Sequence, residues 1–153
     1  MNKLSALTLP SLWVILGACG SDPVQTPQEP REPTLLSFAP IAGAWGGTVT
    51  EIGPSGTATY RVDIVLGQSA PPGAKVGTIA YSESGRDCGG DLVATDVEGS
   101  AYTVEEDLTY GLDRCDNGEI HLVYDVGAGT LAFEWTWPPN PEAWDVTATL
   151  TRS

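Results

Sequence analysis

The sequence is poor in basic residues, in histidine and in methionine. Its 153 residues include 7 Lys and Arg against 20 Asp and Glu, with one His and one Met, and the formal net charge is −13. This charge argues against a nucleic-acid partner, because phosphates select clustered Lys and Arg. It also argues against electrostatic docking on anionic lipid, which needs basic residues near the membrane surface.

A hydrophobic run long enough to span a membrane as a helix is also missing. The apolar stretch from Leu4 to Ala18 covers about fifteen residues, whereas a spanning helix needs about twenty. Because it follows the short basic start Met1-Asn2-Lys3, this stretch fits the hydrophobic region of an export signal. The rest of the chain has the length of one domain.

The apolar stretch ends in Leu16-Gly17-Ala18-Cys19, which resembles the lipobox of bacterial lipoproteins. Signal peptidases accept only small side chains next to the scissile bond, and the cysteine supplies the thiol that is acylated. The resemblance implies that residues 1–18 are a signal peptide and that Cys19 carries acyl chains such as palmitate. The membrane would then be a partner through this lipid anchor. An ordinary secretory signal with an incidental cysteine is the alternative.

Residues 19–36 are predicted to form an extended, disordered tether. Proline recurs every three or four residues between Pro23 and Pro33, and the segment has almost nothing apolar to bury. The mature start Cys19-Gly20-Ser21 lacks Asp after the cysteine, which resembles the pattern that enteric-type bacteria send to the outer membrane. The expected location is the bacterial cell envelope, at the outer membrane if the organism is Gram-negative.

Residues 37–153 show the period-two alternation of strands with one buried face. In the sharpest case Leu131, Phe133, Trp135 and Trp137 alternate with Ala, Glu and Thr. Turn signals rich in Gly, Pro and Asn separate such segments, and no sustained helical period is present. Eight strands are predicted, at about 45–50, 60–66, 75–82, 91–97, 102–110, 120–125, 131–137 and 146–151.

Short consecutive strands with short turns favour an all-β, eight-stranded antiparallel up-and-down barrel, because closure removes exposed edges. A two-sheet β-sandwich uses the same pattern and is the alternative. Gly43-Ala44-Trp45 resembles the G-x-W start of lipocalin-like and avidin-like barrels, in which the Trp plugs one end. That resemblance implies that Arg152 packs over Trp45. The later lipocalin signatures and the C-terminal helix are missing from the sequence.

A second resemblance runs through the whole domain and involves small Cys-paired β domains. Such domains occur in bacterial lipoproteins and as extracellular modules of actinobacterial serine/threonine kinases. The resemblance implies a fold and a compartment, but no established activity. It is carried by Trp45-Gly46-Gly47, Gly77-Thr78 with Tyr81, Cys88-Gly89-Gly90-Asp91-Leu92 and Cys115-Asp116-Asn117-Gly118.

Two cysteines remain once Cys19 is lipidated. Cys88 and Cys115 are an even pair in an oxidising compartment, which favours a disulfide between them. It would tie the start of the fourth predicted strand to the loop before the sixth. A reactive thiol pair or a metal site is the alternative. No His or third Cys lies at ligand spacing, so no metal and no other cofactor is predicted.

Glu106 is the acidic residue that stands out in the predicted strands. It shares the parity of Val104 and Leu108, which places it on the apolar face. If that face is interior, Glu106 is a buried acid that needs a partner such as Arg61, Arg114 or a tyrosine hydroxyl. A bulge that turns its side chain outward is the simpler alternative.

The expected role is a noncatalytic binding or interaction module with an unknown protein or small-molecule partner. The first alternative is a lipocalin-like carrier of a small apolar ligand, with Tyr102, Trp135 and Trp137 lining the cavity. The second is a hydrolase, which has little support because His121 is the only imidazole and no G-x-S-x-G motif accompanies it. No catalytic residue is therefore predicted. An aromatic-lined cavity would favour the carrier.

Overall fold

The computed structural model describes residues 34–82, 85–140 and 144–153. The predicted signal peptide, the predicted lipidation site Cys19 and the predicted tether up to residue 33 lie outside these residues. In the part of the chain that is described, no helix has the length and apolar character needed to cross a bilayer. The elements are β1 (Leu36–Ser37), η1 (Ala39–Ile41), β2 (Gly43–Gly53), β3 (Gly56–Leu66), β4 (Ser69–Ala70), β5 (Lys75–Ser82), β6 (Cys88–Glu98), β7 (Ala101–Tyr110), β8 (Glu119–Asp125), β9 (Thr130–Thr136) and β10 (Asp145–Arg152).

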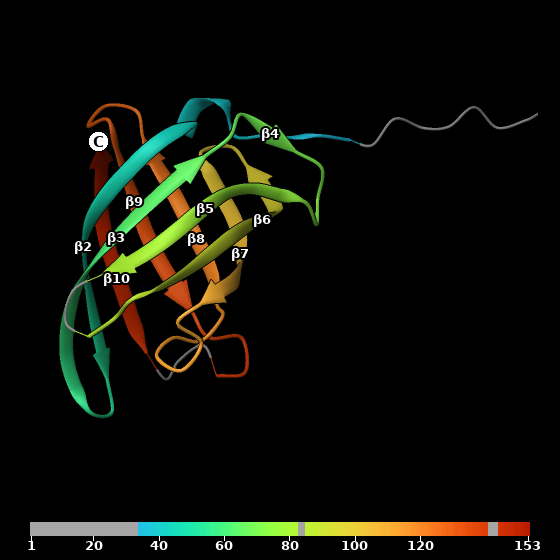
Figure 1. Ribbon diagram of the computed structural model, residues 1–153. Coiled ribbons are helices and arrows are strands. Elements are labelled where there is room, and N and C mark those ends of the chain that lie inside the picture. Colours follow the sequence, from blue (N-terminus) through green and yellow to red (C-terminus); the bar gives the residue numbers. More distant parts are fainter. Residues whose placement is uncertain (1–33, 83–84, 141–143) are drawn as a thin grey trace, which may run out of the picture. The chain divides into compact units, whose positions relative to one another are not determined.

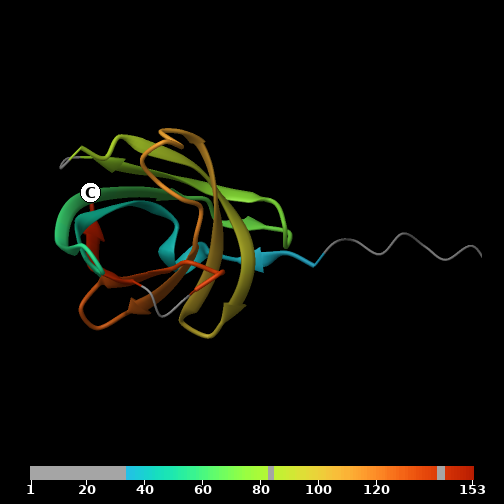
Figure 2. The same cartoon turned by 90° about the horizontal axis from the view of Figure 1, so that it is seen from below.

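Eight of these strands form a closed antiparallel barrel in the order β10-β2-β3-β5-β6-β7-β8-β9 (Figure 1). Each barrel strand pairs with the next one along the chain, and β10 returns to β2 and closes the ring. In Figure 2 the sheet is seen to curve round on itself into a ring. The predicted up-and-down barrel is confirmed, and the fold is not the alternative β-sandwich.

Two short features, the β1–β4 pair and the turn η1, were not predicted from the sequence. β1 pairs with β4 through Leu36–Ala70 and Ser37–Ser69, and these two residues a side are too few to show an alternating pattern. Between β1 and β2, the 3₁₀ turn η1 contains Pro40, and its Ile41 is fully buried. These features place the chain before β2 across one end of the barrel.

The core follows the predicted alternation. In β3, for example, Tyr60, Val62, Ile64 and Leu66 are buried, while the residues between them are exposed or half-buried. Tyr110 is an exception, because the β6–β7 register shifts between Gly89 and Gly90. A shift of one residue moves a side chain to the other face. Tyr110 has the parity of the buried Tyr102, Val104 and Leu108, yet its side chain is 45% exposed.

Trp45 closes one end of the barrel. Its ring is fully buried, and its indole Nε1 donates a hydrogen bond of 2.7 Å to the carbonyl oxygen of Ile41. The Arg152 guanidinium lies 4.4 Å from the centroid of the Trp45 ring and donates hydrogen bonds to the carbonyl oxygens of Ala42 and Pro40. The packing of Arg152 over Trp45, implied by the G-x-W resemblance, is thus present. We call this the closed end.

The predicted disulfide joins Cys88, the first residue of β6, to Cys115, in the loop between β7 and β8. The Cα atoms are 6.4 Å apart, within the usual range for a disulfide. The bond fixes the β7–β8 loop against the start of β6, at the end of the barrel away from Trp45. It thereby fixes the position of Cys115 and its neighbours at that end.

Candidate functional site

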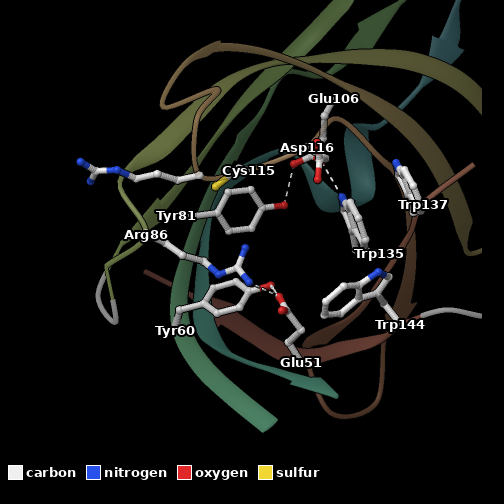
Figure 3. Close-up of a pocket in the computed structure, with 11 residues that line it drawn as sticks. Glu51, Tyr60, Tyr81, Arg86, Glu106, Cys115, Asp116, Trp135, Trp137 and Trp144 are labelled. Carbon is white, nitrogen blue, oxygen red and sulfur yellow. Dashed lines mark hydrogen bonds and ion pairs between the residues drawn. The ribbon is translucent and has the colours of Figure 1, made fainter. Parts of the chain in front are cut away.

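A pocket of about 310 Å³ lies at the end of the barrel opposite Trp45. Its walls combine aromatic rings with a few charged side chains, which Figure 3 shows converging on a common space. The half-buried and exposed lining residues form its rim, while the buried tyrosines and Glu106 form its inner wall. The lining residues are Glu51, Tyr60, Tyr81, Arg86, Glu106, Arg114, Cys115, Asp116, Trp135, Trp137 and Trp144.

Chain direction explains why these residues meet. In an up-and-down barrel, successive strands run in opposite directions. The C-terminal ends of β2, β5, β7 and β9 therefore lie at the same end of the barrel as the N-terminal ends of β3, β6, β8 and β10. Glu51 lies near the end of β2, Tyr60 near the start of β3, Tyr81 near the end of β5 and Trp135 near the end of β9. The β7–β8 loop supplies the opposite wall with Asp116 and its neighbours.

Two glycines allow tryptophan rings to approach the barrel wall. A Cβ at Gly118 would lie 2.0 Å from the indole Nε1 of Trp135, and a Cβ at Gly53 would lie 2.0 Å from the ring of Trp144. Real Cβ atoms do not tolerate such separations, so only glycine fits at either position with the rings where they are. The pocket walls therefore depend on these two glycines.

Glu106 lies at the centre of the inner wall and is 6% exposed. Its Oε1 accepts a hydrogen bond of 2.6 Å from the Tyr81 hydroxyl. Its Oε2 accepts one of 2.6 Å from the Trp135 indole Nε1 and one of 3.1 Å from the Gly118 backbone N–H. Burial raises the pKa of Glu106 from 4.5 to about 7, although these three donors favour the ionised form.

The structure decides between the two interpretations of Glu106. Its side chain is interior, so the outward-turning bulge is wrong, and a tyrosine hydroxyl is the partner of the kind that was expected. Arg61 points to the outer face, where it pairs with Asp63 at 2.5 Å. Arg114 lines the pocket, but its ion pair is with Asp113, at 3.7 Å. In the described part of the chain, none of the ion pairs involves Glu106.

A second polar group is built around Glu51. Its Oε2 accepts a hydrogen bond of 3.0 Å from the Tyr60 hydroxyl and forms an ion pair of 2.5 Å with Arg86. The Arg86 guanidinium also lies 4.3 Å from the centroid of the Tyr60 ring. Tyr60 in turn meets Tyr81 edge to face, with 5.8 Å between ring centroids. Burial is the largest cause that raises the pKa of each tyrosine well above its ordinary value, so both stay neutral.

Comparison with protein-family models, with curated proteins and with solved structures finds no match. The chemistry of the pocket is therefore the basis on which a function can be argued.

Of the three aromatic residues predicted to line a cavity, the structure brings together two. Trp135 and Trp137 line the pocket. Tyr102 does not, and this prediction is wrong: the residue is 2% exposed and packs against Phe38, with 5.4 Å between ring centroids. It lies near the start of β7, the fifth barrel strand, and therefore at the closed end with Trp45.

Of the eleven lining residues, the sequence analysis predicted only Trp135 and Trp137 as cavity lining. The residues that it missed include Glu51, Tyr60, Tyr81 and Arg86. The signal that could have found the two tyrosines is strand direction combined with parity. Both side chains face inward, Tyr60 near the start of β3 and Tyr81 near the end of β5. Because β3 and β5 run in opposite directions, these two positions lie at the same end of the barrel. Arg86 follows residues 83–84, which lie outside the described part of the chain, and no periodic pattern marks it.

His121 lies on the outer side of β8, away from the pocket. Its Nε2 is 2.9 Å from the Glu119 carboxylate, and its side chain is 41% exposed. Among the described residues, no group of three or more His, Cys, Asp and Glu side chains is arranged to hold a metal ion. The pocket instead presents aromatic faces and one buried carboxyl, which is an arrangement suited to holding a small molecule.

Proposed function

We propose that this domain binds a small molecule in the aromatic pocket at the open end of its barrel, without catalysing a reaction. The same proposal places it at a bacterial envelope, carried by acyl chains on Cys19 and a Pro-rich tether. The resemblance of the sequence to Cys-paired envelope modules and to lipocalin-like barrels is consistent with this role. A ligand-binding role is the more specific form of the binding module that the sequence suggests.

The observation that carries the proposal is the composition of the pocket. Ligand sites are typically concave, several hundred cubic ångströms in volume and mainly apolar, with a few convergent polar groups. This pocket has three tryptophans, two buried tyrosines, three carboxylates and two arginines in about 310 Å³. An eight-stranded barrel is just wide enough to hold one small ligand at its mouth.

The polar groups of the pocket favour binding over hydrolysis. A nucleophile or general base needs a free position beside the reacting atom. Glu51 is held by Tyr60 and Arg86, and both oxygens of Glu106 accept hydrogen bonds from the protein. These hydrogen bonds and this ion pair are suited to holding a fixed shape around a ligand.

Native mass spectrometry of the chain purified from its own envelope fraction tests the ligand-binding role. The expected result is a co-purifying small molecule that is released on unfolding. Trp137→Ala, which removes a rim residue, should reduce its occupancy several-fold. Val126→Ala, at an exposed position near the closed end, is the matched control and should retain it. A wild-type protein that carries no ligand and gives no thermal shift with a small-molecule library would contradict the proposal.

A separate experiment tests the proposed lipid anchor at the cell envelope. Cys19→Ser should remove the acylation site, so the variant should lack the added acyl mass. Intact mass should show the wild-type chain without residues 1–18 and with added acyl mass. A wild-type chain that keeps residues 1–18 and carries no added acyl mass would overturn the lipid anchor but would leave ligand binding untouched.

A further inference from the structure

The Glu106 carboxylate accepts hydrogen bonds from the protein, but no cationic side chain is paired with it among the described residues. Its partners are a phenol, an indole and a backbone amide, all of them neutral. A buried carboxylate normally has a cationic partner, because hydrogen bonds from neutral groups offset only part of the loss of hydration. A cation at the centre of the pocket, next to the aromatic rings, would therefore balance the charge of Glu106.

The arginines nearest to the pocket are already paired with other acids. Arg86 is neutralised by Glu51, at 2.5 Å, and sits over the Tyr60 ring. Arg114, at the rim, pairs with Asp113, and Asp116 adds a further acid to the same loop. The pocket thus combines an uncompensated inner carboxylate with a rim that carries charges of both signs. The chain as a whole has a net charge of −13, which favours approach of a cation.

The remaining walls are aromatic faces. Trp135, Trp137 and Trp144 lie on one side of the pocket and Tyr81 and Tyr60 on the other, with Arg86 over the Tyr60 ring (Figure 3). The negative faces of such rings attract cations, tryptophan most strongly, and cages of this kind suit ammonium groups that carry methyls instead of N–H donors. Methyl groups also bury apolar area against the rings.

We propose that the ligand is a small organic cation with a methylated ammonium head, which sits among the three tryptophans with Glu106 as its counter-charge. This inference rests on the proposed ligand-binding function and names the ligand class. The hydrogen bonds and the charge of Glu106 argue against two other ligand classes. A primary ammonium or a guanidinium brings several donors, but Oε2 already accepts two hydrogen bonds and Oε1 accepts one. A neutral sugar would leave the buried charge uncompensated.

Calorimetric titration of the full chain with choline at pH 8 tests the inference, with tetramethylammonium as a competitor that carries the head group alone. The neutral comparison is 3,3-dimethylbutan-1-ol, in which carbon replaces the choline nitrogen. The buffer should contain a polyoxyethylene detergent, because detergents with a choline head would compete. Choline should bind at least about tenfold more tightly than its neutral isostere.

Glu106→Gln provides the charge test. The glutamine carbonyl can accept from Trp135 and Gly118 while its amide donates to the Tyr81 oxygen, so the wall keeps its shape. This variant should bind choline at least about tenfold more weakly than wild type. Glu105→Gln is the matched control: it makes the same change one residue earlier on β7, on the exposed face, and should bind as wild type. The isostere comparison on wild type keeps the test valid should Glu106→Gln not fold.

The outcomes separate the ligand class from the ligand-binding function. Equal affinity for choline and its isostere, or unchanged choline binding by folded Glu106→Gln, would overturn the cation while leaving a small-molecule site. No choline binding by wild type would also overturn the cation, and native mass spectrometry would then decide the proposed function alone. For a confirmed cation, pelleting of Cys19→Ser with phosphatidylcholine vesicles that is lost on adding Glu106→Gln would identify the source as a lipid head group. Pelleting that Glu106→Gln leaves unchanged, or no pelleting, would identify a free cation.

Discussion

The indole of Trp135 donates its hydrogen bond to Glu106, 29 residues earlier in the chain, at 2.6 Å. This bond joins the end of β9 to the middle of β7 across the interior of the barrel. The same carboxylate holds Tyr81 from β5. One buried acid therefore ties three strands together and sets the positions of two aromatic walls of the pocket. Changes to Glu106 should alter both folding stability and the ligand site.

The first prediction concerns pH and stability. The folded protein holds a proton on Glu106 up to about pH 7, whereas the unfolded chain releases it near 4.5. Unfolding therefore releases a proton between these values, and raising the pH through this window destabilises the folded state. The contribution of Glu106 to the free energy of unfolding should fall by roughly 3 kcal/mol from pH 4.5 to pH 8.

Urea unfolding across that pH range measures this effect. Glu106→Gln should lack the dependence, so that its stability relative to wild type rises with pH. Glu105→Gln lies on the exposed face and should follow the wild-type curve. Parallel curves for wild type and Glu106→Gln would show that the carboxyl titrates normally in the folded state.

A second prediction concerns Gly118. Alanine there would place its Cβ 2.0 Å from the Trp135 indole nitrogen, so the ring must move away from Glu106. Gly118→Ala should cost about 1–3 kcal/mol, the usual range for overpacking, and should change tryptophan fluorescence. Gly127→Ala, in the exposed β8–β9 turn, is the control and should have little effect, because its nearest neighbour lies at 3.3 Å. Equal stability of the two variants would mean that Trp135 is not held against Gly118.

The fold was largely predictable because it depends on local patterns. Alternation placed Tyr60, Val62 and Ile64 inside, and the G-x-W resemblance implied the contact between Trp45 and Arg152. These features need only parity and the order of strands. Tyr110 shows the limit, since a single bulge reversed its face.

The pocket was harder to predict because it depends on register. The bond between Tyr81 and Glu106 spans 25 residues and that between Glu106 and Trp135 spans 29. Their meeting depends on bulges and loop lengths that accumulate across several strands. Tyr102 and Trp135 are both inward aromatic residues, and only strand direction assigns them to opposite ends of the barrel.

A third prediction concerns the disulfide. The Cys88–Cys115 bond closes a loop with a sequence separation of 27. In the chain-entropy account, such a loop is worth roughly 3–4 kcal/mol. Reduction, or the double change Cys88→Ala with Cys115→Ala, should lower the free energy of unfolding by that amount. It should also weaken ligand binding, since Cys115 lines the pocket. Urea unfolding with and without reductant measures the first effect, and an unchanged midpoint would contradict it.

The last prediction joins the titration of Glu106 to ligand binding. A methylated ammonium keeps its charge at every pH, so any pH dependence of its binding comes from the protein. Below about pH 7 the folded protein carries a protonated Glu106, which must ionise before it can balance the cation. Choline affinity should therefore fall as the pH is lowered, approaching tenfold per pH unit. Other titratable or charged side chains in the same pocket are Tyr81 on β5, Tyr60 on β3, Glu51 on β2, Arg86 after β5, and Arg114 and Asp116 in the β7–β8 loop.

The effect of these neighbours on the pH dependence of binding can be distinguished from that of Glu106 by their chemistry and by the variant Glu106→Gln. The pKa values of Tyr60 and Tyr81 are raised above their usual range, so neither tyrosine changes charge between pH 5 and pH 8. Any contribution from Glu51 or Asp116 persists in Glu106→Gln. Titrations of both proteins with choline at pH 5, 6, 7 and 8 should therefore show a steep dependence in wild type and a flat one in the variant. Equal slopes would assign the dependence to another acid, because Glu106 is the group that the two proteins do not share.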